Sequence, residues 1–298
     1  MFKKMISLAV MATLCMSVTA CGSGDNTAAG NGEQSAQMDA DGGQTDLDGD
    51  AQDGDAQDGS SADSDKAAVV DKGTLVVGIT DFEPMDYKDE NGNWIGFDAD
   101  MAAAFAKSLG VKAEFVEIEW DNKALELSSG NIDCVWNGMT LTDEVKSSMD
   151  CSNPYCNNAQ IVIVPSDQAA DYQTVDSLSG LNFAVEVGSA GEEQAKEHEL
   201  NYTAVSNQAG ALMEVAAGTS DAAIIDSLMA AAMVGEGTSY DQLTYTVGLN
   251  SEEYGVGFRK GSDLKDALNE FFKASYADGT MQKTADTYGV QAALIPQE

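Results

Sequence analysis

Four short polar sets follow apolar stretches of this 298-residue chain, and their groups suit the binding of a small molecule with two charges. Residues 188–192 (Gly-Ser-Ala-Gly-Glu) open a predicted helix, where free backbone N–H groups attract a carboxylate. Asp226 follows another apolar run and can accept hydrogen bonds from an ammonium group. Residues 138–140 add carbonyls, an N–H and a hydroxyl, and Phe82 adds an apolar lid. Together these groups match an amino-acid zwitterion.

The elements that must position these sets alternate between strand and helix patterns. The predicted strands are 75–79, 113–118, 132–136, 161–164, 183–187, 203–205, 222–225 and 254–258. The predicted helices are 98–109, with Asp98 as its N-cap, 189–199, 207–217 and two late helices split by 278–280. This alternation favours an α/β fold with mostly parallel sheets covered by helices. Such sheets bind ligands beyond the carboxyl ends of their strands.

The charge balance excludes several classes of function. Fifty Asp and Glu residues stand against 15 Lys and Arg, so the formal net charge is −35, which argues against a nucleic-acid surface. The chain has one histidine, His198, so a site built from several histidines is impossible. We expect neither a metal nor a cofactor. Hydrophobic residues make up 43% of the chain, which is enough for a packed core.

Residues 1–20 predict an export signal. Two lysines precede an apolar run, 5–18, which is too short for a comfortable membrane span and is followed by small residues. Residues 18–22 (Val-Thr-Ala-Cys-Gly) resemble a bacterial lipoprotein box, which implies that Cys21 is lipidated. The alternative is an ordinary secretory signal with an incidental cysteine. Several acyl chains would hold the protein on the extracytoplasmic face of the cell membrane.

Residues 21–66 predict a disordered acidic tether. Asp, Gly, Ala, Gln and Ser dominate this segment, so it buries too little apolar surface to offset its chain entropy. Residues 46–50 hint at a calcium loop, but the glycine and the distal glutamate that such a loop needs are missing. We therefore favour a tether.

Three further cysteines lie in the part of the chain that should fold. Cys134 sits within an apolar run, which predicts a buried thiol. Cys151 and Cys156 are near each other in the sequence and should lie outside the cell, where a disulfide can form. Two separate reduced thiols are the alternative.

A series of short motifs runs through residues 70–290. Two examples are 96–98 (Gly-Phe-Asp) and 138–142 (Gly-Met-Thr-Leu-Thr). Others lie at 100–102, 129–133, 152–155, 177–181, 188–192, 221–226, 254–256, 259–261 and 277–280. In this order they resemble the polar-amino-acid group of extracellular solute-binding proteins, family 3, which serve ABC transporters and have the type 2 periplasmic-binding-protein fold. Each motif is weak alone, whereas their shared order is specific.

The resemblance implies a two-lobed clamshell, and the restart of the strand series near residue 161 independently suggests two lobes. Lobe 1 should take residues 67–157 and 252–298, and lobe 2 should take residues 162–247. Two crossing strands, near 157–160 and 250–253, would form the hinge. A ligand that contacts both lobes would favour the closed form.

The resemblance also implies roles for particular residues. Asp226 would bind an α-ammonium, residues 138 and 140 would supply a carbonyl and an N–H, and residues 189 and 190 would donate to an α-carboxylate. Phe82 and Trp120 would wall the ligand side chain. Capping of the helix that follows is the alternative role for Asp226. The full expected ligand-binding set is Phe82, Trp120, Lys123, Gly138, Met139, Thr140, Glu186, Ser189, Ala190 and Asp226.

Two positions depart from the family pattern. Val145 stands where the family usually has an arginine that clasps the α-carboxylate. Lys123 would supply the missing cation, or it is a solvated helix residue. Glu186 falls where the family often has an apolar pocket residue. It would meet a polar or cationic ligand side chain, or it would pair with Lys123.

These features predict a monomeric, lipid-anchored receptor that captures a small polar solute, expected to be an amino acid, and delivers it to an ABC permease and its ATPase. A dehydratase-type enzyme on the same fold is one alternative, and Glu186 is its one nameable acid or base. A ligand-sensing module is another. We expect a binding protein rather than an enzyme, because no paired nucleophile and base is visible in the sequence.

Overall fold

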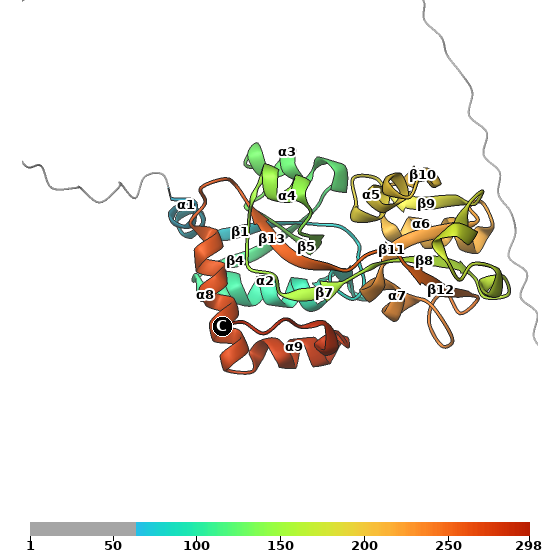
Figure 1. Ribbon diagram of the computed structural model, residues 1–298. Coiled ribbons are helices and arrows are strands. Elements are labelled where there is room, and N and C mark those ends of the chain that lie inside the picture. The colour runs from blue at the N-terminus through green and yellow to red at the C-terminus, as the bar shows by residue number, and fades with distance from the viewer. Residues whose placement is uncertain (1–63) are drawn as a thin grey trace, which may run out of the picture. The chain divides into compact units, whose positions relative to one another are not determined.

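The computed structural model describes residues 64–298, which form two α/β lobes (Figure 1). The sheet of lobe 1 has the strand order β4-β1-β5-β13-β6, with β7 also paired to β13. Its strands are β1 (Thr74–Ile79), β4 (Lys112–Glu117), β5 (Cys134–Thr140), β6 (Asp150–Cys151), β7 (Cys156–Asn158) and β13 (Glu252–Phe258). Strands β4, β1 and β5 are parallel, and β13 runs antiparallel to β5.

Helices and a small hairpin complete lobe 1. The helices are α1 (Asp65–Lys72), α2 (Phe97–Ser108), α3 (Lys123–Ser128), α4 (Asp143–Ser148), α8 (Leu264–Ala277) and α9 (Thr280–Tyr288). The hairpin joins β2 (Tyr87–Lys88) to β3 (Trp94–Ile95). Gly92 in its turn has φ +81°, a left-handed conformation that glycine adopts without steric cost.

Lobe 2 has a five-stranded sheet in the order β10-β9-β11-β8-β12. Its strands are β8 (Gln160–Pro165), β9 (Asn182–Glu186), β10 (Asn201–Val205), β11 (Ala222–Asp226) and β12 (Leu243–Gly248). Its helices are α5 (Ala190–Glu197), α6 (Gln208–Ala217) and α7 (Ser227–Met233). Strands β10, β9 and β11 are parallel, β8 runs antiparallel to β11, and β12 runs antiparallel to β8. The predicted fold class is therefore confirmed.

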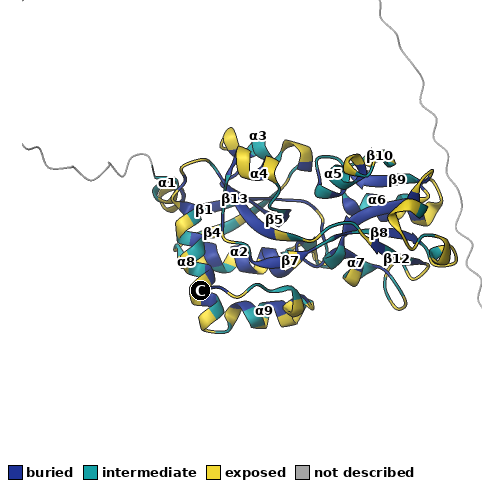
Figure 2. Cartoon of the chain, viewed as in Figure 1, coloured by how far each residue is buried: buried dark blue, intermediate teal, exposed yellow. Residues whose placement is uncertain are grey.

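The buried strands follow from their apolar sequences. All five residues of β11 are buried, and β5 and β9 are buried along most of their length (Figure 2). In lobe 1 the Trp136 ring packs edge-on against Phe272 at 5.5 Å between centroids and lies 6.3 Å from Phe105. Trp136 is thus a core residue. These packed layers fix the carboxyl ends of the strands, where the polar sets emerge.

Two crossing segments, around residues 158–160 and 249–252, join the two lobes. Asn158 on β7 pairs with Glu252 on β13. The Gln160 backbone N–H donates to the Asn250 side-chain oxygen at 2.7 Å, and the Leu249 N–H donates to the Gln160 carbonyl at 2.8 Å. Hydrogen bonds thus tie the two crossings to each other.

The prediction of Asp98 as an N-cap is wrong. Helix α2 begins at Phe97, and Gly96 is its N-cap, with φ +129°. Asp98 is fully buried beneath the strand end at Gly138, whose N–H donates to Asp98 Oδ2 at 2.6 Å. The Tyr155 hydroxyl donates to the same oxygen at 2.6 Å. Asp98 therefore supports the strand end rather than the helix end.

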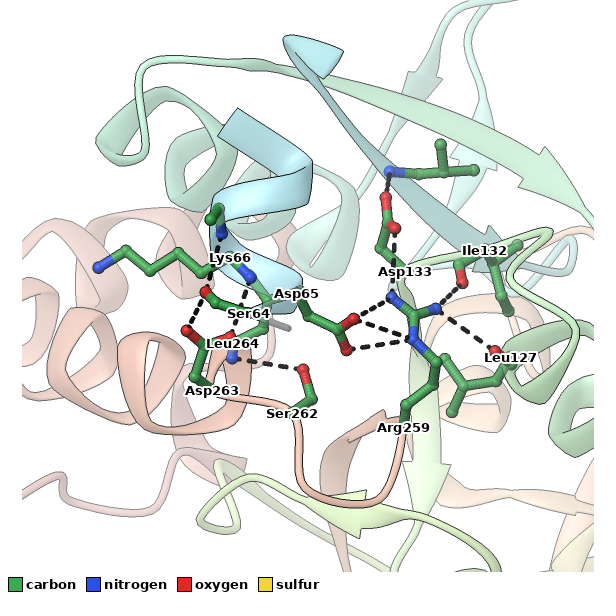
Figure 3. Close-up of polar contacts among 12 residues, drawn as sticks. Ser64, Asp65, Lys66, Leu127, Ile132, Asp133, Arg259, Ser262, Asp263 and Leu264 are labelled. Carbon is green, nitrogen blue, oxygen red and sulfur yellow. Dashed lines mark hydrogen bonds and ion pairs between the residues drawn. The ribbon is translucent and has the colours of Figure 1, made fainter. Parts of the chain in front are cut away.

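Residues 64–66, which the composition assigns to the tether, are part of the fold, because Ser64 caps α1 and both Asp65 and Lys66 lie in it. The Ser64 side chain accepts a hydrogen bond from the Ala67 N–H and caps α1. The Arg259 guanidinium reaches Asp65 at 3.0 Å and donates to the Ile132 carbonyl at 2.7 Å (Figure 3). Ion pairing and helix capping thus hold residues 64–66 on lobe 1, although composition alone assigns them to the tether.

Cys151 and Cys156 do not form the disulfide that their spacing allows, and Cys134, Cys151 and Cys156 are free thiols. Cys151 pairs with Gly257 and Cys156 pairs with Tyr254 on the same strand. Three residues of strand separate these partners by about 10 Å, which is too far for a disulfide. The alternative of separate reduced thiols holds, and Cys134 is buried as predicted.

The predicted export signal, the Cys21 lipidation site, the calcium loop and the tether up to residue 63 lie outside the described residues. Within residues 64–298, no helix has both the length and the apolar character needed to cross a bilayer. The same residues contain no group of three or more side chains placed to hold a metal ion.

Candidate functional site

A cavity of about 200 Å³ lies between the two lobes, at the carboxyl ends of β5, β9 and β11. All ten expected ligand-binding residues line it, although they come from segments far apart in the sequence. They are Phe82, Trp120, Lys123, Gly138, Met139, Thr140, Glu186, Ser189, Ala190 and Asp226. The cavity thus lies beyond the strand ends, where sheets of this kind bind their ligands.

The floor of the cavity is the end of β5. Gly138 has φ +53°, and a Cβ atom there would lie 2.4 Å from the Phe82 ring, so glycine is required for this packing. The Asn137 side chain accepts hydrogen bonds from the Thr80 N–H at 3.0 Å and the Thr80 hydroxyl at 2.7 Å. The Gly138 N–H already bonds to Asp98, so its carbonyl is the group available to a ligand.

Asp226 is the best-connected side chain in the cavity. Its Oδ1 accepts hydrogen bonds from the Tyr254 hydroxyl at 2.6 Å, from Gln160 Nε2 at 3.1 Å and from Asn158 Nδ2. Its Oδ2 accepts from Gln208 Nε2. No side-chain bond caps α7, so capping is not the role of this carboxylate.

The surroundings of Asp226 disfavour its charge in the empty cavity. Burial raises the pKa of Asp226 to about 7, and the nearby Glu252 carboxylate adds to this effect. Hydrogen bonds from Tyr254, Gln208 and Gln160 act in the opposite direction without cancelling it. A ligand cation would restore the charge on this carboxylate, because an opposite charge lowers the pKa of an acid.

The same amide groups connect Asp226 to the hinge. Glu252 Oε1 accepts from Asn158 Nδ2 at 2.6 Å, from Gln160 Nε2 at 2.8 Å and from the Thr140 hydroxyl at 2.9 Å. Asn158 and Gln160 also donate to Asp226. A change at Asp226 therefore reaches both crossing segments through shared donors.

The turn before α5, where a carboxylate is expected to bind, lines the cavity. The Ser189 side-chain oxygen accepts from the Glu192 N–H at 3.2 Å and caps the helix, and its backbone N–H donates to the Glu186 carbonyl at 3.3 Å. The Ser189 hydroxyl hydrogen therefore remains available for donation. Ala190 begins α5, and its N–H belongs to the first turn, which has no acceptor within the helix.

Lys123 extends from lobe 1 to this turn. Its ammonium donates to the Gly188 carbonyl at 2.8 Å and lies 4.8 Å from the centroid of the Trp120 ring. Burial lowers the pKa of Lys123, and the charges of Glu186 and other acids oppose that shift. The lysine is thus a half-buried contact between the lobes, and the alternative of a solvated helix residue is wrong.

Position 145, where the family usually has an arginine, also lines this cavity. Val145 is buried and lines the cavity, so the departure from the family pattern falls within the site. The sequence contains one arginine, Arg259, which binds the start of α1 instead. The cationic side chains lining the cavity are Lys123 and Lys196, and Lys196 pairs with Glu192 at 3.1 Å.

Glu186 is deeply buried at the end of β9, and its Oε1 has no hydrogen-bond partner among the described residues. Burial raises the pKa of Glu186 to about 8, and the charge of Asp226 raises it further, while Lys123 and Gln208 oppose the shift. Among the described residues Glu186 and Lys123 form no direct ion pair, although the charge of the lysine lowers the pKa of the acid.

Sequence reasoning missed several residues that shape the site. Gln208, the first residue of α6, bonds Asp226 at both its side chain and its N–H. Gln208 closely follows β10, so examining that strand end as well would have found it. Asn158 and Gln160 fall in the segment predicted as hinge, but nothing in their spacing shows that they share donors between two acids.

Comparisons with known proteins agree with this geometry. The model of the bacterial extracellular solute-binding proteins, family 3, matches residues 75–291. The L-cystine-binding protein TcyJ of Escherichia coli K12 is 29% identical over 225 residues, which cover 74% of this chain and 84% of TcyJ. The arginine-binding extracellular protein ArtP of Bacillus subtilis 168 is 32% identical over 221 residues, which cover 71% of this chain and 84% of ArtP.

A solved structure gives the same result. The ancestral amino acid-binding protein AncCDT-1, a precursor of cyclohexadienyl dehydratase, superposes with a TM-score of 0.70 at 34% identity, covering 76% of this chain and 99% of that one. These relatives are binding proteins, which confirms the expectation of a binding protein rather than an enzyme. The chain belongs to the bacterial extracellular solute-binding proteins, family 3.

Proposed function

We propose that this protein captures a polar amino acid outside the cytoplasm and delivers it to an ABC importer. The family match and the names of the relatives support this role. The position of Asp226 is the main structural support for this proposal. Its buried carboxylate lies in the cavity between the two lobes, beside the two crossing segments. An ammonium at this place would contact the group that joins binding to the hinge.

In the proposed complex the α-ammonium lies against Asp226, and the Gly138 carbonyl accepts one of its protons. The α-carboxylate lies at the turn before α5, against the Ser189 hydroxyl and the Ala190 N–H. Lys123 supplies the positive charge that an arginine at position 145 supplies in the family. Its ammonium lies beside the turn before α5, 2.8 Å from the Gly188 carbonyl. Charge-assisted hydrogen bonds of this kind are about twice as strong as neutral ones.

Ligand binding would favour closure because the ligand contacts both lobes at once. Lobe 1 would contribute the β5 end, Phe82, Trp120 and Lys123, and lobe 2 would contribute the turn before α5 and Asp226. The closed form gains all of these contacts, whereas the open form keeps those of one lobe. The closed, loaded form is the one that the permease would recognise.

We further propose that Cys21 carries a lipid anchor and that the acidic segment after it is a tether. The order of basic start, apolar run, small residues and cysteine supports this proposal. Mass spectrometry of the mature N-terminus tests it. Acylation at Cys21 is expected, and an unmodified N-terminus at another residue would contradict the anchor.

Titration calorimetry of the purified full-length protein against the common amino acids tests the proposed function. Saturable binding of at least one amino acid, with the ligand recovered unchanged, is expected. Failure of every amino acid to bind would reject the proposal, and conversion of the ligand to a product would instead indicate an enzyme.

A further inference from the structure

Glu186 has no structural role that explains its burial. Its side chain is 3% exposed, lines the cavity and carries an oxygen with no hydrogen-bond partner among residues 64–298. An ionised carboxylate in such a place is costly unless a cation or several donors accompany it. Lys123 and Gln208 favour the negative charge of this acid only in part, because burial and the charge of Asp226 outweigh them.

The charged and polar groups that face Glu186 come from several elements. Asp226 faces it from the end of β11, Gln208 from α6, Lys123 from α3, and Glu119 from the segment before α3. Two of these groups are acids, and the one cation is held by the Gly188 carbonyl. No resident ion pair therefore satisfies Glu186 in the described part of the chain.

The lining of the cavity has an excess of acid. Its carboxylates outnumber its two lysines, and one of those lysines is paired with Glu192. The acids are Asp121, Glu144, Glu186, Glu192, Glu193 and Asp226. A zwitterion needs one of them for its ammonium, so the remaining potential of the cavity is negative and favours a second positive charge on the ligand.

We infer that Glu186 forms a second cation subsite, which binds a basic group on the ligand side chain. This inference rests on the proposed function and narrows it to amino acids with an ammonium or guanidinium side chain. Asp226 then binds the α-ammonium, Lys123 meets the α-carboxylate, and Glu186 binds the distal cation.

The subsite also links binding to protons. Without a bound cation we expect Glu186 to hold a proton at pH 7, because its burial beside Asp226 disfavours the charge and raises its pKa to about 8. When the distal cation enters, the Glu186 carboxyl O–H bond breaks, its proton leaves to solvent, and the carboxylate pairs with the cation. The ligand keeps its own charge throughout. Binding of a basic amino acid therefore releases protons and strengthens as the pH rises toward 8.

Calorimetry with matched ligands tests the subsite. L-Arginine and L-citrulline have the same length, and citrulline carries an uncharged urea in place of the guanidinium. L-Lysine and L-glutamine form a second charged and uncharged pair. For the full-length protein we expect the charged member of at least one pair to bind about tenfold or more tightly than its uncharged partner, a difference of about 1.4 kcal/mol.

Variants at residue 186 separate charge from shape. Glu186→Gln should bring the two members of a pair to within about threefold of each other, and so should Glu186→Leu, which restores the apolar type usual in the family. Glu114→Gln makes the same charge change on an exposed strand outside the cavity and should preserve the preference. Equal preferences in wild type and both 186 variants would overturn the inference.

Proton release provides an independent measurement. Titrations at pH 7 in buffers of different ionisation enthalpy give the number of protons released per ligand bound. More protons should leave the wild type than Glu186→Gln when a basic amino acid binds, with the remainder assigned to Asp226. Equal release in both proteins would contradict the inference.

The outcomes also separate this inference from the proposed function. Tight binding of uncharged amino acids alone would reject the cation subsite and leave an amino-acid receptor standing. Failure of every amino acid to bind would reject both.

Discussion

The two ends of strand β13 use similar charged side chains in opposite ways. At its first residue, Glu252 shares amide donors with Asp226 beside the cavity. Directly after its last residue, Arg259 joins Asp65 and Asp133 beside α1 (Figure 3). In the Arg259 cluster each acid has a cationic partner, whereas in the cavity Asp226 has amide and hydroxyl donors and Glu186 Oε1 has no partner within the described residues.

This difference distinguishes a structural cluster from a binding site. Paired acids are stabilised by the protein itself, so a mutation there should change the free energy of unfolding. Acids without a cationic partner in the protein can instead attract a cationic group of a ligand. Mutations in the cavity should therefore change affinity more than stability, and mutations in the Arg259 cluster should do the reverse.

The largest expected effect is on affinity. Asp226→Ala should weaken binding of the cognate amino acid about hundredfold, or about 2.7 kcal/mol, because the α-ammonium would lose its buried anionic partner. Titration calorimetry measures the loss. Asp263→Ala is the matched control and should keep full affinity, because Asp263 accepts hydrogen bonds from Ser64 and the Lys66 N–H at the start of α1, outside the cavity. Unchanged affinity in Asp226→Ala would remove this residue from the site.

The second effect is on stability. Arg259→Ala should lower the free energy of unfolding by about 2 kcal/mol, since it leaves Asp65 and the carbonyl of Ile132 without their partner. Urea denaturation measures this change, and calorimetry should give unchanged affinity. Lys265→Ala removes an exposed ion pair and should cost less than about 0.5 kcal/mol. Equal losses in the two variants would mean that the Arg259 cluster does not hold α1.

The third effect is a gain in affinity for the amino acid when an arginine replaces Val145. Val145→Arg should tighten binding of an amino acid by about tenfold, since a guanidinium in the cavity can bind the α-carboxylate bidentately. Val145→Met is the control for added bulk and should show no gain. An arginine variant that binds the amino acid and its α-amide with equal improvement would show that the carboxylate does not reach this wall.

A fourth prediction concerns the pH dependence of stability without ligand. Burial raises the pKa of Glu186 to about 8 and those of Asp226 and Asp98 to about 7. Between the ordinary values, near 4, and these raised values, the folded protein binds more protons than the unfolded chain. The free energy of unfolding should therefore fall as the pH rises from about 4 to 8. Thermal melts should show a smaller fall in Glu186→Gln, and a rise in the melting temperature of the wild type over this range would contradict the assigned shifts.

The sequence predicted most of the fold because apolar runs and helix signals were strong. Strands β1, β9 and β11 fall within a residue or so of their predicted bounds. It failed at Asp98, because a carboxylate early in a helix has the pattern of a cap whether it is exposed or buried. It also placed residues 64–66 in the tether, since the partner of Asp65 is Arg259, nearly two hundred positions later.

The sequence predicted where the site lies, but it did not predict the hydrogen bonds among the side chains of the site. Strand ends and family motifs brought all ten expected residues to one cavity. The lost arginine at Val145 and the unusual acid at Glu186 could be read from the sequence. The sharing of Asn158 and Gln160 between two acids could not, because it depends on the side-chain geometry of two crossing segments.

A crystal structure of the protein with its bound amino acid tests the central claim most directly. We expect the α-ammonium to lie within hydrogen-bond distance of Asp226, inside the cavity between the lobes. A ligand whose ammonium is bound elsewhere, with Asp226 still held only by its amide and hydroxyl donors, would contradict it.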